Sequence, residues 1–329
     1  MHVMFGCGAE QVDPLDDPPG AADSSGESPS STISSTVGPG GGGTIEPPPT
    51  EPNALRVAVL GDAGYGNASQ LKVGEAMGTV CASHDGCHLA LYLGDNIYPS
   101  GVTSVSDEQL QTKFEDMYAE LSFPFFVVLG NHDYGGGLDM MRAQAQVDYT
   151  GFSDKWSMPE RYYAFSSPVP DVNVAFFMMD TQNLIQTGDV EQADWLEDAV
   201  KDSKAAWKIA SGHHPYISNG YHGNAGVYDG NEGSGMELKT VVDASLCDKV
   251  DLYLSGHDHN RQWFPPTCGV EFIVSGAGAS VRSLPGENPV LFQDEDKMGF
   301  LLLQITNERL VGTFYDENAL PQFTRTIVK

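Results

Sequence analysis

Short runs of apolar, often β-branched residues recur along the chain from Leu55 onward. Short, mainly apolar runs of this length are typical of buried strands. They lie at residues 55–60, 88–93, 125–129, 172–179, 207–211, 250–255, 270–275 and 300–305. We therefore predict a sheet-based folded domain over residues 55–329.

Between several of these runs, apolar residues recur with helical spacing. The segments 67–82, 106–120 and 191–203 fit this pattern. Alternating strands and helices predict an α/β fold, and the last third of the chain is richer in strands. We therefore predict a four-layer α/β/β/α sandwich of two packed mixed sheets flanked by helices, rather than one doubly wound sheet.

Residues 1–54 have a different composition. They contain no Lys or Arg and are rich in Pro, Gly, Ser and acidic residues, so we predict a disordered acidic linker. Its "VMFGC" resembles the end of a bacterial lipoprotein signal, with Cys7 as the lipidated residue. A basic start and an apolar stretch of about 7–15 residues do not precede it. Either the natural start lies upstream or the likeness is fortuitous.

The net charge and the cysteines limit which partners and which cellular compartment we expect. The formal net charge of −28 weighs against nucleic acid and anionic membranes as partners, and an anionic substrate would need a local positive charge such as a metal ion. No 18-residue apolar run predicts a transmembrane segment. Besides Cys7, the cysteines form two pairs, which predict the disulfides Cys81–Cys87 and Cys247–Cys268 and an extracytoplasmic compartment. The alternative is buried free thiols in the cytosol.

Five of the apolar runs end in glycine followed by a side chain that can bind metal. The motifs are "GDAG", "GDNIY", "GNHDY", "GHHP" and "GHDH". The carboxyl ends of strands in α/β sheets meet at one crevice, and glycine permits a sharp turn there. Each motif alone could be a turn, a helix cap or packing. Five at equivalent positions predict one shared metal site.

The donor types suggest two different ions. Asp62, Asp95 and Tyr98 offer anionic oxygens, which suit a trivalent ion such as Fe(III), whereas amide and imidazole groups suit Zn, Fe(II) or Mn. If Asp95 bridges, each ion receives a set of its own. Two ions about 3.5–4 Å apart form the clamp used in phosphoryl transfer.

Taken in order, the five motifs resemble those of the calcineurin-like metallophosphoesterases. The tyrosine of "GDNIY" and the segment "WSMPERYYAF" (156–165) are similar to features of the purple acid phosphatases of the tartrate-resistant type. The chain thus resembles a bacterial member of that group. The resemblance covers about residues 55–329 and implies a catalytic domain there. It implies Asp62, Asp95, Tyr98 and His259 as ligands of Fe(III), and Asp95, Asn131, His213 and His257 as ligands of the divalent ion (Zn, Fe or Mn).

The resemblance also implies roles for residues beside these ligands. His132 would contact phosphate, and His222 would donate a proton to the leaving group; both would bind substrate together with Asn131. The alternatives are a structural hydrogen bond from His132 to Asp133 and an ordinary exposed loop position for His222. His214 is expected outside the ligand set, because the family usually has tyrosine there. Asp258 is expected to be a solvated spacer.

The function expected from this resemblance is a binuclear-metal acid phosphatase. It would hydrolyse phosphomonoesters by attack of a metal-bound hydroxide. The alternatives are a phosphodiesterase or nucleotidase of the same superfamily, and a non-catalytic surface binding protein on the same scaffold. We expect a monomer that acts on small phosphate esters at the periplasm or cell surface, or after secretion.

Overall fold

The computed structural model describes residues 46–329. The predicted lipidation site, Cys7, and most of the predicted linker therefore lie outside the described residues. Near the end of the predicted linker, the backbone N–H of Glu51 donates to Gln304, and the Gln304 amide donates to the carbonyl of Pro49. The chain is thus attached to the folded domain a few residues before its first strand.

Two mixed sheets of seven strands each form the centre of the domain. In the first sheet the order is β14-β13-β12-β1-β2-β3-β4. Its strands are β1 (Leu55–Leu60), β2 (Leu89–Leu93), β3 (Phe125–Val128), β4 (Trp156–Ser157), β12 (Gly299–Ile305), β13 (Arg309–Asp316) and β14 (Pro321–Val328). Strands β1 to β4 run parallel, and β12 pairs antiparallel with β1.

The second sheet has the order β11-β9-β10-β8-β7-β6-β5. Its strands are β5 (Tyr163–Ser166), β6 (Val174–Met178), β7 (Trp207–Ser211), β8 (Leu252–Ser255), β9 (Arg261–Trp263), β10 (Glu271–Ser275) and β11 (Phe292–Asp294). Strands β6, β7, β8 and β10 are parallel to one another. Every one of the eight predicted apolar runs forms one of these fourteen strands.

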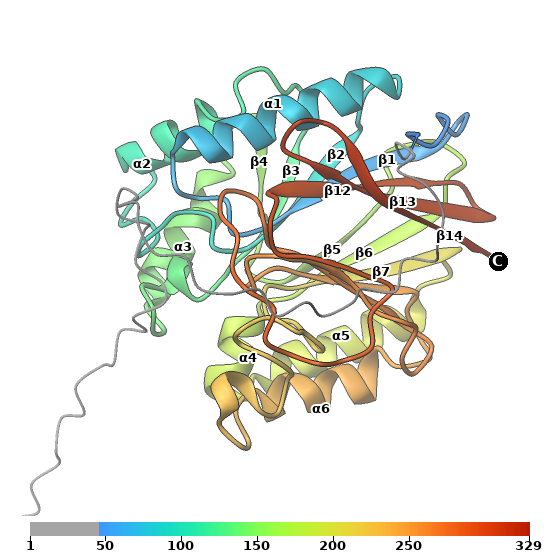
Figure 1. Cartoon of the computed structure of the whole chain (residues 1–329). Coiled ribbons are helices and arrows are strands. Elements are labelled where there is room, and N and C mark those ends of the chain that lie inside the picture. The colour runs from blue at the N-terminus through green and yellow to red at the C-terminus, as the bar shows by residue number, and fades with distance from the viewer. Residues whose placement is uncertain (1–45) are drawn as a thin grey trace, which may run out of the picture. The chain divides into compact units, whose positions relative to one another are not determined.

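Helices cover the outer faces of the two sheets, as Figure 1 shows, and the predicted four-layer α/β/β/α sandwich is confirmed. Its α-helices are α1 (Ala68–Ser83), α2 (Glu108–Leu110), α3 (Met140–Tyr149), α4 (Thr181–Thr187), α5 (Val190–Asp202) and α6 (Met236–Ser245). The predicted helices 67–82 and 191–203 correspond to α1 and α5. The predicted helix 106–120 is shorter: α2 continues only into the π-helical turn Gln111–Glu115.

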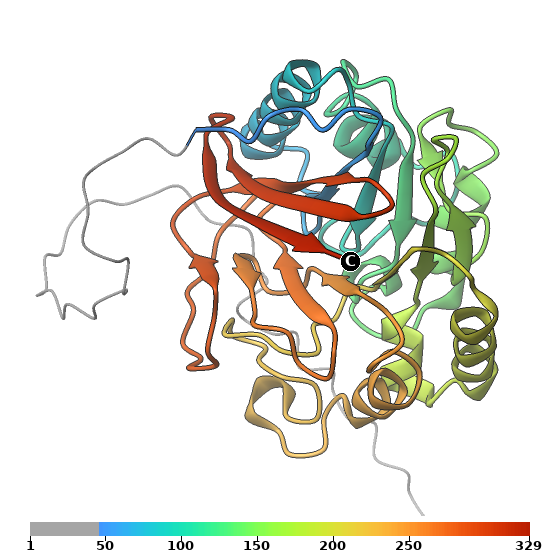
Figure 2. The ribbon, with the colours of Figure 1, turned by 90° about the vertical axis from the view of Figure 1, so that its right-hand side faces the viewer.

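Two hydrophobic cores hold these layers together. The larger joins both sheets, since Val57 of β1 and Leu303 of β12 belong to the same buried cluster as Trp207 of β7. The smaller packs α5 and α6 against the outer face of the second sheet. Figure 2 shows β12, β13 and β14 in red lying above the orange strands of the second sheet. There the Arg325 guanidinium of β14 donates to Glu271 of β10 at 2.9 and 2.6 Å, and links the two sheets.

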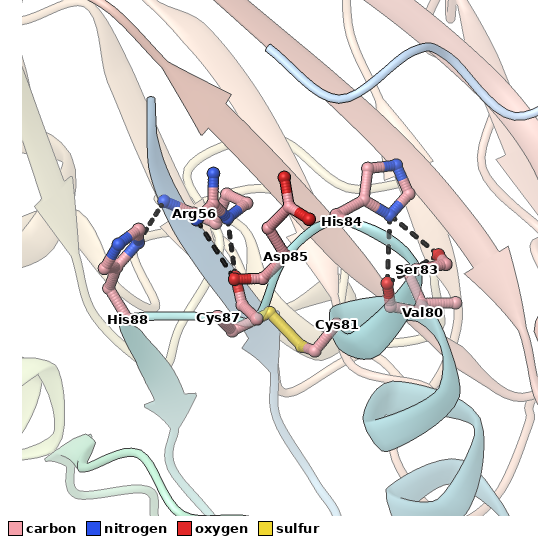
Figure 3. Close-up of a disulfide and its surroundings, with 9 residues drawn as sticks. Arg56, Val80, Cys81, Ser83, His84, Asp85, Cys87 and His88 are labelled. Carbon is pink, nitrogen blue, oxygen red and sulfur yellow. Dashed lines mark hydrogen bonds between the residues drawn. A yellow bond between two sulfur atoms is a disulfide. The ribbon is translucent and has the colours of Figure 1, made fainter. Parts of the chain in front are cut away.

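Both predicted disulfides are present. Figure 3 shows the Cys81–Cys87 bond at the end of α1, where the chain turns into β2. The Arg56 side chain of β1 donates to the carbonyl of Gly86 inside this loop, and the Arg56 backbone N–H donates to His88 at 3.0 Å. The disulfide therefore closes a loop that is also attached to the adjacent strand. Disulfides of this kind are typical of extracytoplasmic proteins. None of the helices in residues 46–329 is long and apolar enough to cross a membrane.

Candidate metal centre

The five predicted motifs lie at the carboxyl ends of β1, β2, β3, β7 and β8, which come from both sheets. Backbone hydrogen bonds continue beyond the strands and hold these ends together. The N–H of Asp62 donates to the carbonyl of Gly94, and the N–H of Gly256 donates to the carbonyl of His213. The side chains that follow the strands therefore face one another at the same end of the sandwich.

The hydroxyl of Tyr98 points at two carboxylates and one imidazole. Its Oη lies 3.0 Å from Oδ2 of Asp95, 3.4 Å from Oδ1 of Asp62 and 3.1 Å from Nε2 of His259. All four residues are buried. Four donor atoms from three separate loops thus converge on one point.

A second donor group lies next to the first and shares Asp95 with it. Nε2 of His213 lies 3.4 Å from Oδ2 of Asp95, 3.1 Å from Oδ1 of Asn131 and 3.1 Å from Nδ1 of His257. Asp95 Oδ2 is therefore close to both donor groups. A bridging ligand would occupy this position in a two-ion site.

The electrostatics of the two groups fit positive ions. Burial raises the pKa of Asp62, because the folded chain shields its carboxylate from solvent and so disfavours the charged form. Burial acts in the same direction on Asp95, but the charges of His213 and His132 outweigh it and hold the pKa of Asp95 below its ordinary value. Burial alone would lower the pKa of His213, yet Asp95 raises it to about 9. The ionised form of these buried carboxylates is thus stabilised by positive charge nearby. Together with the imidazole nitrogens, they form a donor set that metal ions can use.

Ligand atoms within 4.8 Å of one another define two potential ion sites in the described part of the chain. One consists of Asp62, Asp95 and His213, and the other of His213, His214 and His257. The second includes His214, which we expect from the sequence outside the ligand set. Its ring centroid lies 4.4 Å from that of His257, and its Nδ1 lies 2.8 Å from Oγ1 of Thr181. His213 and His214 are thus neighbouring candidates for the same position as a metal ligand.

The backbone at the candidate ligands is locally strained. Asp62, Asp95 and His257 adopt left-handed conformations with φ of 57°, 53° and 69°. Such conformations are uncommon for residues other than glycine and tend to occur at functional sites.

Two of the motif glycines leave space for ligands of neighbouring strands. A Cβ at Gly130 would lie 2.1 Å from Oδ1 of Asp95, and a Cβ at Gly256 would lie 2.4 Å from Oδ2 of Asp62. Any larger residue would therefore displace a carboxylate that belongs to another motif.

Asp133 connects two of the motif loops beneath the site. Its buried carboxylate accepts hydrogen bonds from the backbone N–H groups of Asn96, Ile97 and Gly130. Burial, together with the negative charge of Asp95, raises the pKa of Asp133 to about 6. The "GDNIY" and "GNHDY" loops are thereby held at a fixed separation.

His132 lies beside the Tyr98 side of the centre. Its backbone N–H donates to Oδ1 of Asp95 at 3.0 Å, and its ring centroid lies 4.6 Å from that of Tyr98. Nδ1 of its ring lies 2.6 Å from the carbonyl oxygen of Pro99. The ring is therefore held by the Pro99 carbonyl, whereas the carboxylate of Asp133 binds the loop backbone.

His222 lies on the opposite side, against His257. Their rings stack with centroids 4.0 Å apart, and His222 is buried, so it is not an ordinary exposed loop residue. The expectation for Asp258 was wrong: the residue is 2% exposed, and its carboxylate accepts hydrogen bonds from Ser218 Oγ and from the His222 backbone N–H. Burial raises the pKa of Asp258. Asp258 fixes the loop that carries His222.

Two further residues of the site carry no distinctive signal in the sequence. Tyr65 stacks on Tyr98 with ring centroids 4.1 Å apart, and burial raises the pKa of Tyr65 to about 12. Asp229 lies 2.7 Å from Nδ1 of His222. An aromatic residue near a turn and an acidic residue in a glycine-rich loop have ordinary structural explanations, so only the folded chain reveals these contacts.

Known proteins resemble this chain over most of its length. The chain is 29% identical over 311 residues to tartrate-resistant acid phosphatase type 5 of Oryctolagus cuniculus, which covers 84% of this chain and 91% of the rabbit protein.

Two solved structures share the fold. GAP50, described as the anchor in the inner membrane complex of Plasmodium, has a TM-score of 0.70 at 24% identity. The match covers 84% of this chain and 89% of the GAP50 chain. The purple acid phosphatase PPD1 from yellow lupin (Lupinus luteus) seeds has a TM-score of 0.64 at 19% identity. The match covers 86% of this chain and 55% of the PPD1 chain.

The family model of the calcineurin-like phosphoesterases matches residues 55–261, which include all five motifs and every candidate ligand of the two donor groups. This chain therefore belongs to the calcineurin-like phosphoesterase family.

Proposed function

We propose that this protein is an acid phosphatase that hydrolyses phosphomonoesters at a binuclear metal centre. The observation that carries the proposal is the position of Tyr98 Oη, within 3.4 Å of both Asp62 and Asp95. A phenol ordinarily loses its proton near pH 10, so a tyrosinate ligand requires a strongly acidic ion such as Fe(III). The likeness to a tartrate-resistant acid phosphatase supports the same activity.

Under this proposal the two donor groups divide between two ions. Asp62, Asp95, Tyr98 and His259 would hold Fe(III), and Asp95, Asn131, His213 and His257 would hold Zn, Fe or Mn in the divalent state. When bound, the two ions would supply positive charge for the phosphate ester and acidify a water molecule.

The remaining chemistry belongs to side chains at the edge of the centre. His132, held by Asp95 and by the carbonyl of Pro99, would donate a hydrogen bond to a phosphate oxygen. As water attacks phosphorus, the bond from phosphorus to the ester oxygen breaks and its electron pair remains on that oxygen. His222 would donate a proton to this oxygen, so that an alcohol and inorganic phosphate are released.

The Tyr98→Phe variant tests the ferric site. Protein purified without chelators should show a visible tyrosinate-to-iron absorption band, and Tyr98→Phe should lose it while keeping the fold. Tyr65→Phe is the matched control, because Tyr65 stacks on Tyr98 but lies outside the proposed ligand set. Colourless protein that contains only zinc or manganese would contradict the assignment of Tyr98 and favour a divalent-metal phosphodiesterase.

A panel of esters tests the reaction. We expect turnover of 4-nitrophenyl phosphate to exceed turnover of bis(4-nitrophenyl) phosphate and to be greatest at acidic pH. The reverse preference would favour the phosphodiesterase. Stoichiometric metal without turnover of any ester, nucleotides included, would instead indicate a binding protein on this scaffold.

A further inference from the structure

The His222 ring has a carboxylate partner on its own loop. Nδ1 of His222 lies 2.7 Å from Oδ1 of Asp229, and the Asp229 backbone N–H donates to the His222 carbonyl at 3.0 Å. A side-chain contact and a backbone hydrogen bond therefore join the same two residues. The segment from residue 222 to residue 229 is closed at its ends by these contacts.

The loop around this pair is well anchored. Tyr228, which precedes Asp229, is buried, and its hydroxyl donates to the carbonyl of Pro215, the last residue of the "GHHP" motif. Asp229 itself adopts a left-handed conformation with φ of 55°. At the other end of the loop, Asp258 accepts the backbone N–H of His222. Both ends of the segment are thus held relative to β8 and the candidate metal centre.

These contacts determine which edge of the imidazole faces which group. One face of the His222 ring lies against His257, and the Nδ1 edge lies against Asp229. A carboxylate at Nδ1 stabilises the tautomer that carries its proton there, and it also stabilises the imidazolium form. Because that tautomer has no proton on Nε2, donation to a leaving group would occur from Nε2 of the imidazolium, which then becomes the neutral ring protonated at Nδ1.

We propose that Asp229 is a positioning residue that fixes the orientation and tautomer of His222 and so favours esters with poor leaving groups. The proposal rests on the proposed function. Alkoxide leaving groups need a proton as they depart, whereas 4-nitrophenolate leaves readily without one. The substrates favoured by the Asp229–His222 pair are therefore alkyl phosphates, such as phosphorylated sugars, polyols or serine.

Two substitutions separate the carboxylate from the backbone conformation. Asp229→Gly removes the acceptor and tolerates the left-handed φ. Asp229→Asn keeps the side-chain size and also tolerates that conformation, but it can present its NH₂ group to Nδ1 and so favour the other tautomer. Asp85→Gly is the control, because Asp85 is an exposed aspartate with φ of 61° in the remote Cys81–Cys87 loop.

The first measurement compares turnover of glycerol 2-phosphate with turnover of 4-nitrophenyl phosphate. We expect Asp229→Gly to lower turnover of the alkyl ester by roughly 10–100-fold, as is usual for residues that orient a functional histidine. The aryl ester should change by no more than about 3-fold on the same reasoning. Asp229→Asn should lose turnover of the alkyl ester to a similar extent. Asp85→Gly should remain close to wild type on both esters. Equal losses on both esters in Asp229→Gly, or no loss on either, would overturn the proposal.

The second measurement does not depend on activity. Nitrogen-15 NMR of histidine-labelled, metal-free full-length protein reports the protonated ring nitrogen, and the His222 signal is assigned by its loss in His222→Gln. We expect a proton on Nδ1 in wild type and a shift towards Nε2 in Asp229→Gly. An unchanged spectrum would refute the tautomer assignment. If no ester is turned over, the proposed function fails, while this spectrum still decides whether Asp229 sets the tautomer of His222.

Discussion

At the scale of single residues, Asp95 is the carboxylate that lies next to both donor groups of the candidate centre. Its Oδ2 faces both Tyr98 and His213, and its Oδ1 accepts the backbone N–H of His132. A residue in this position contacts both donor groups and the backbone of His132. Its replacement is therefore expected to affect both ions, whereas replacement of a ligand specific to one group affects one.

The neighbouring histidines of the "GHHP" motif provide the sharpest test of the ligand set. We expect His213→Ala to lower the metal content from two ions towards one per chain, because Nε2 of His213 faces Asp95 and Asn131. His214→Ala should retain both ions. Metal content after desalting, measured by elemental analysis, decides between them. Equal loss in the two variants would place His214 among the ligands.

Sequence reasoning located the candidate ligands but missed the residues that hold them. The ligands follow strands at equivalent positions, so the topology of the fold brings them together. Asp258 stands between two histidines of a motif and looks like an exposed spacer, yet it is buried against Ser218, forty residues earlier in the chain. Contacts of this kind depend on loop geometry that no local pattern encodes.

At the scale of elements, apolar runs predicted the central strands well and the edges poorly. The edge strand β14 has exposed residues along its length, so no continuous apolar run announces it. β9 is only three residues long. In place of the predicted helix at 106–120, the chain forms α2 followed by a π-helical turn. Asp107 caps the N-terminus of α2. Tertiary packing, rather than local propensity, determined these differences.

The two disulfides should contribute unequally to stability. They close loops with sequence separations of 6 and 21 residues. Loop-closure entropy in the unfolded chain then predicts contributions of about 2 kcal/mol for Cys81–Cys87 and about 3 kcal/mol for Cys247–Cys268. Urea unfolding of the two double-alanine variants measures this difference. A larger loss for the shorter loop would show that its attachment to Arg56, rather than loop entropy, dominates.

At the scale of the whole molecule, the site lies where the two sheets meet. Asp62, Asp95 and Asn131 follow strands of the first sheet, whereas His213 and His257 follow strands of the second. The shared core and the Arg325–Glu271 pair fix the sheets relative to each other. Metal binding at this junction should therefore stabilise the sandwich as one unit.

Thermal unfolding with and without zinc tests this coupling. Binding to the folded state alone, at a free concentration 100 times Kd, stabilises by about 2.7 kcal/mol, which corresponds to a rise in Tm of about 4–5 °C for a domain of this size. We expect this rise in wild type and in the exposed-site control Asp198→Asn, and its loss in Asp95→Asn. A rise that persists in Asp95→Asn would place the zinc elsewhere.

The glycines of the motifs have a consequence for how such a site can change over time. Because Gly130 leaves room for Asp95 and Gly256 leaves room for Asp62, a substitution in one motif disables the donor of another. Intermediate sequences that lack one glycine would therefore lose metal binding before any replacement could compensate. The motifs therefore constrain one another, because a side chain added in one of them would occupy the space of a carboxylate from another.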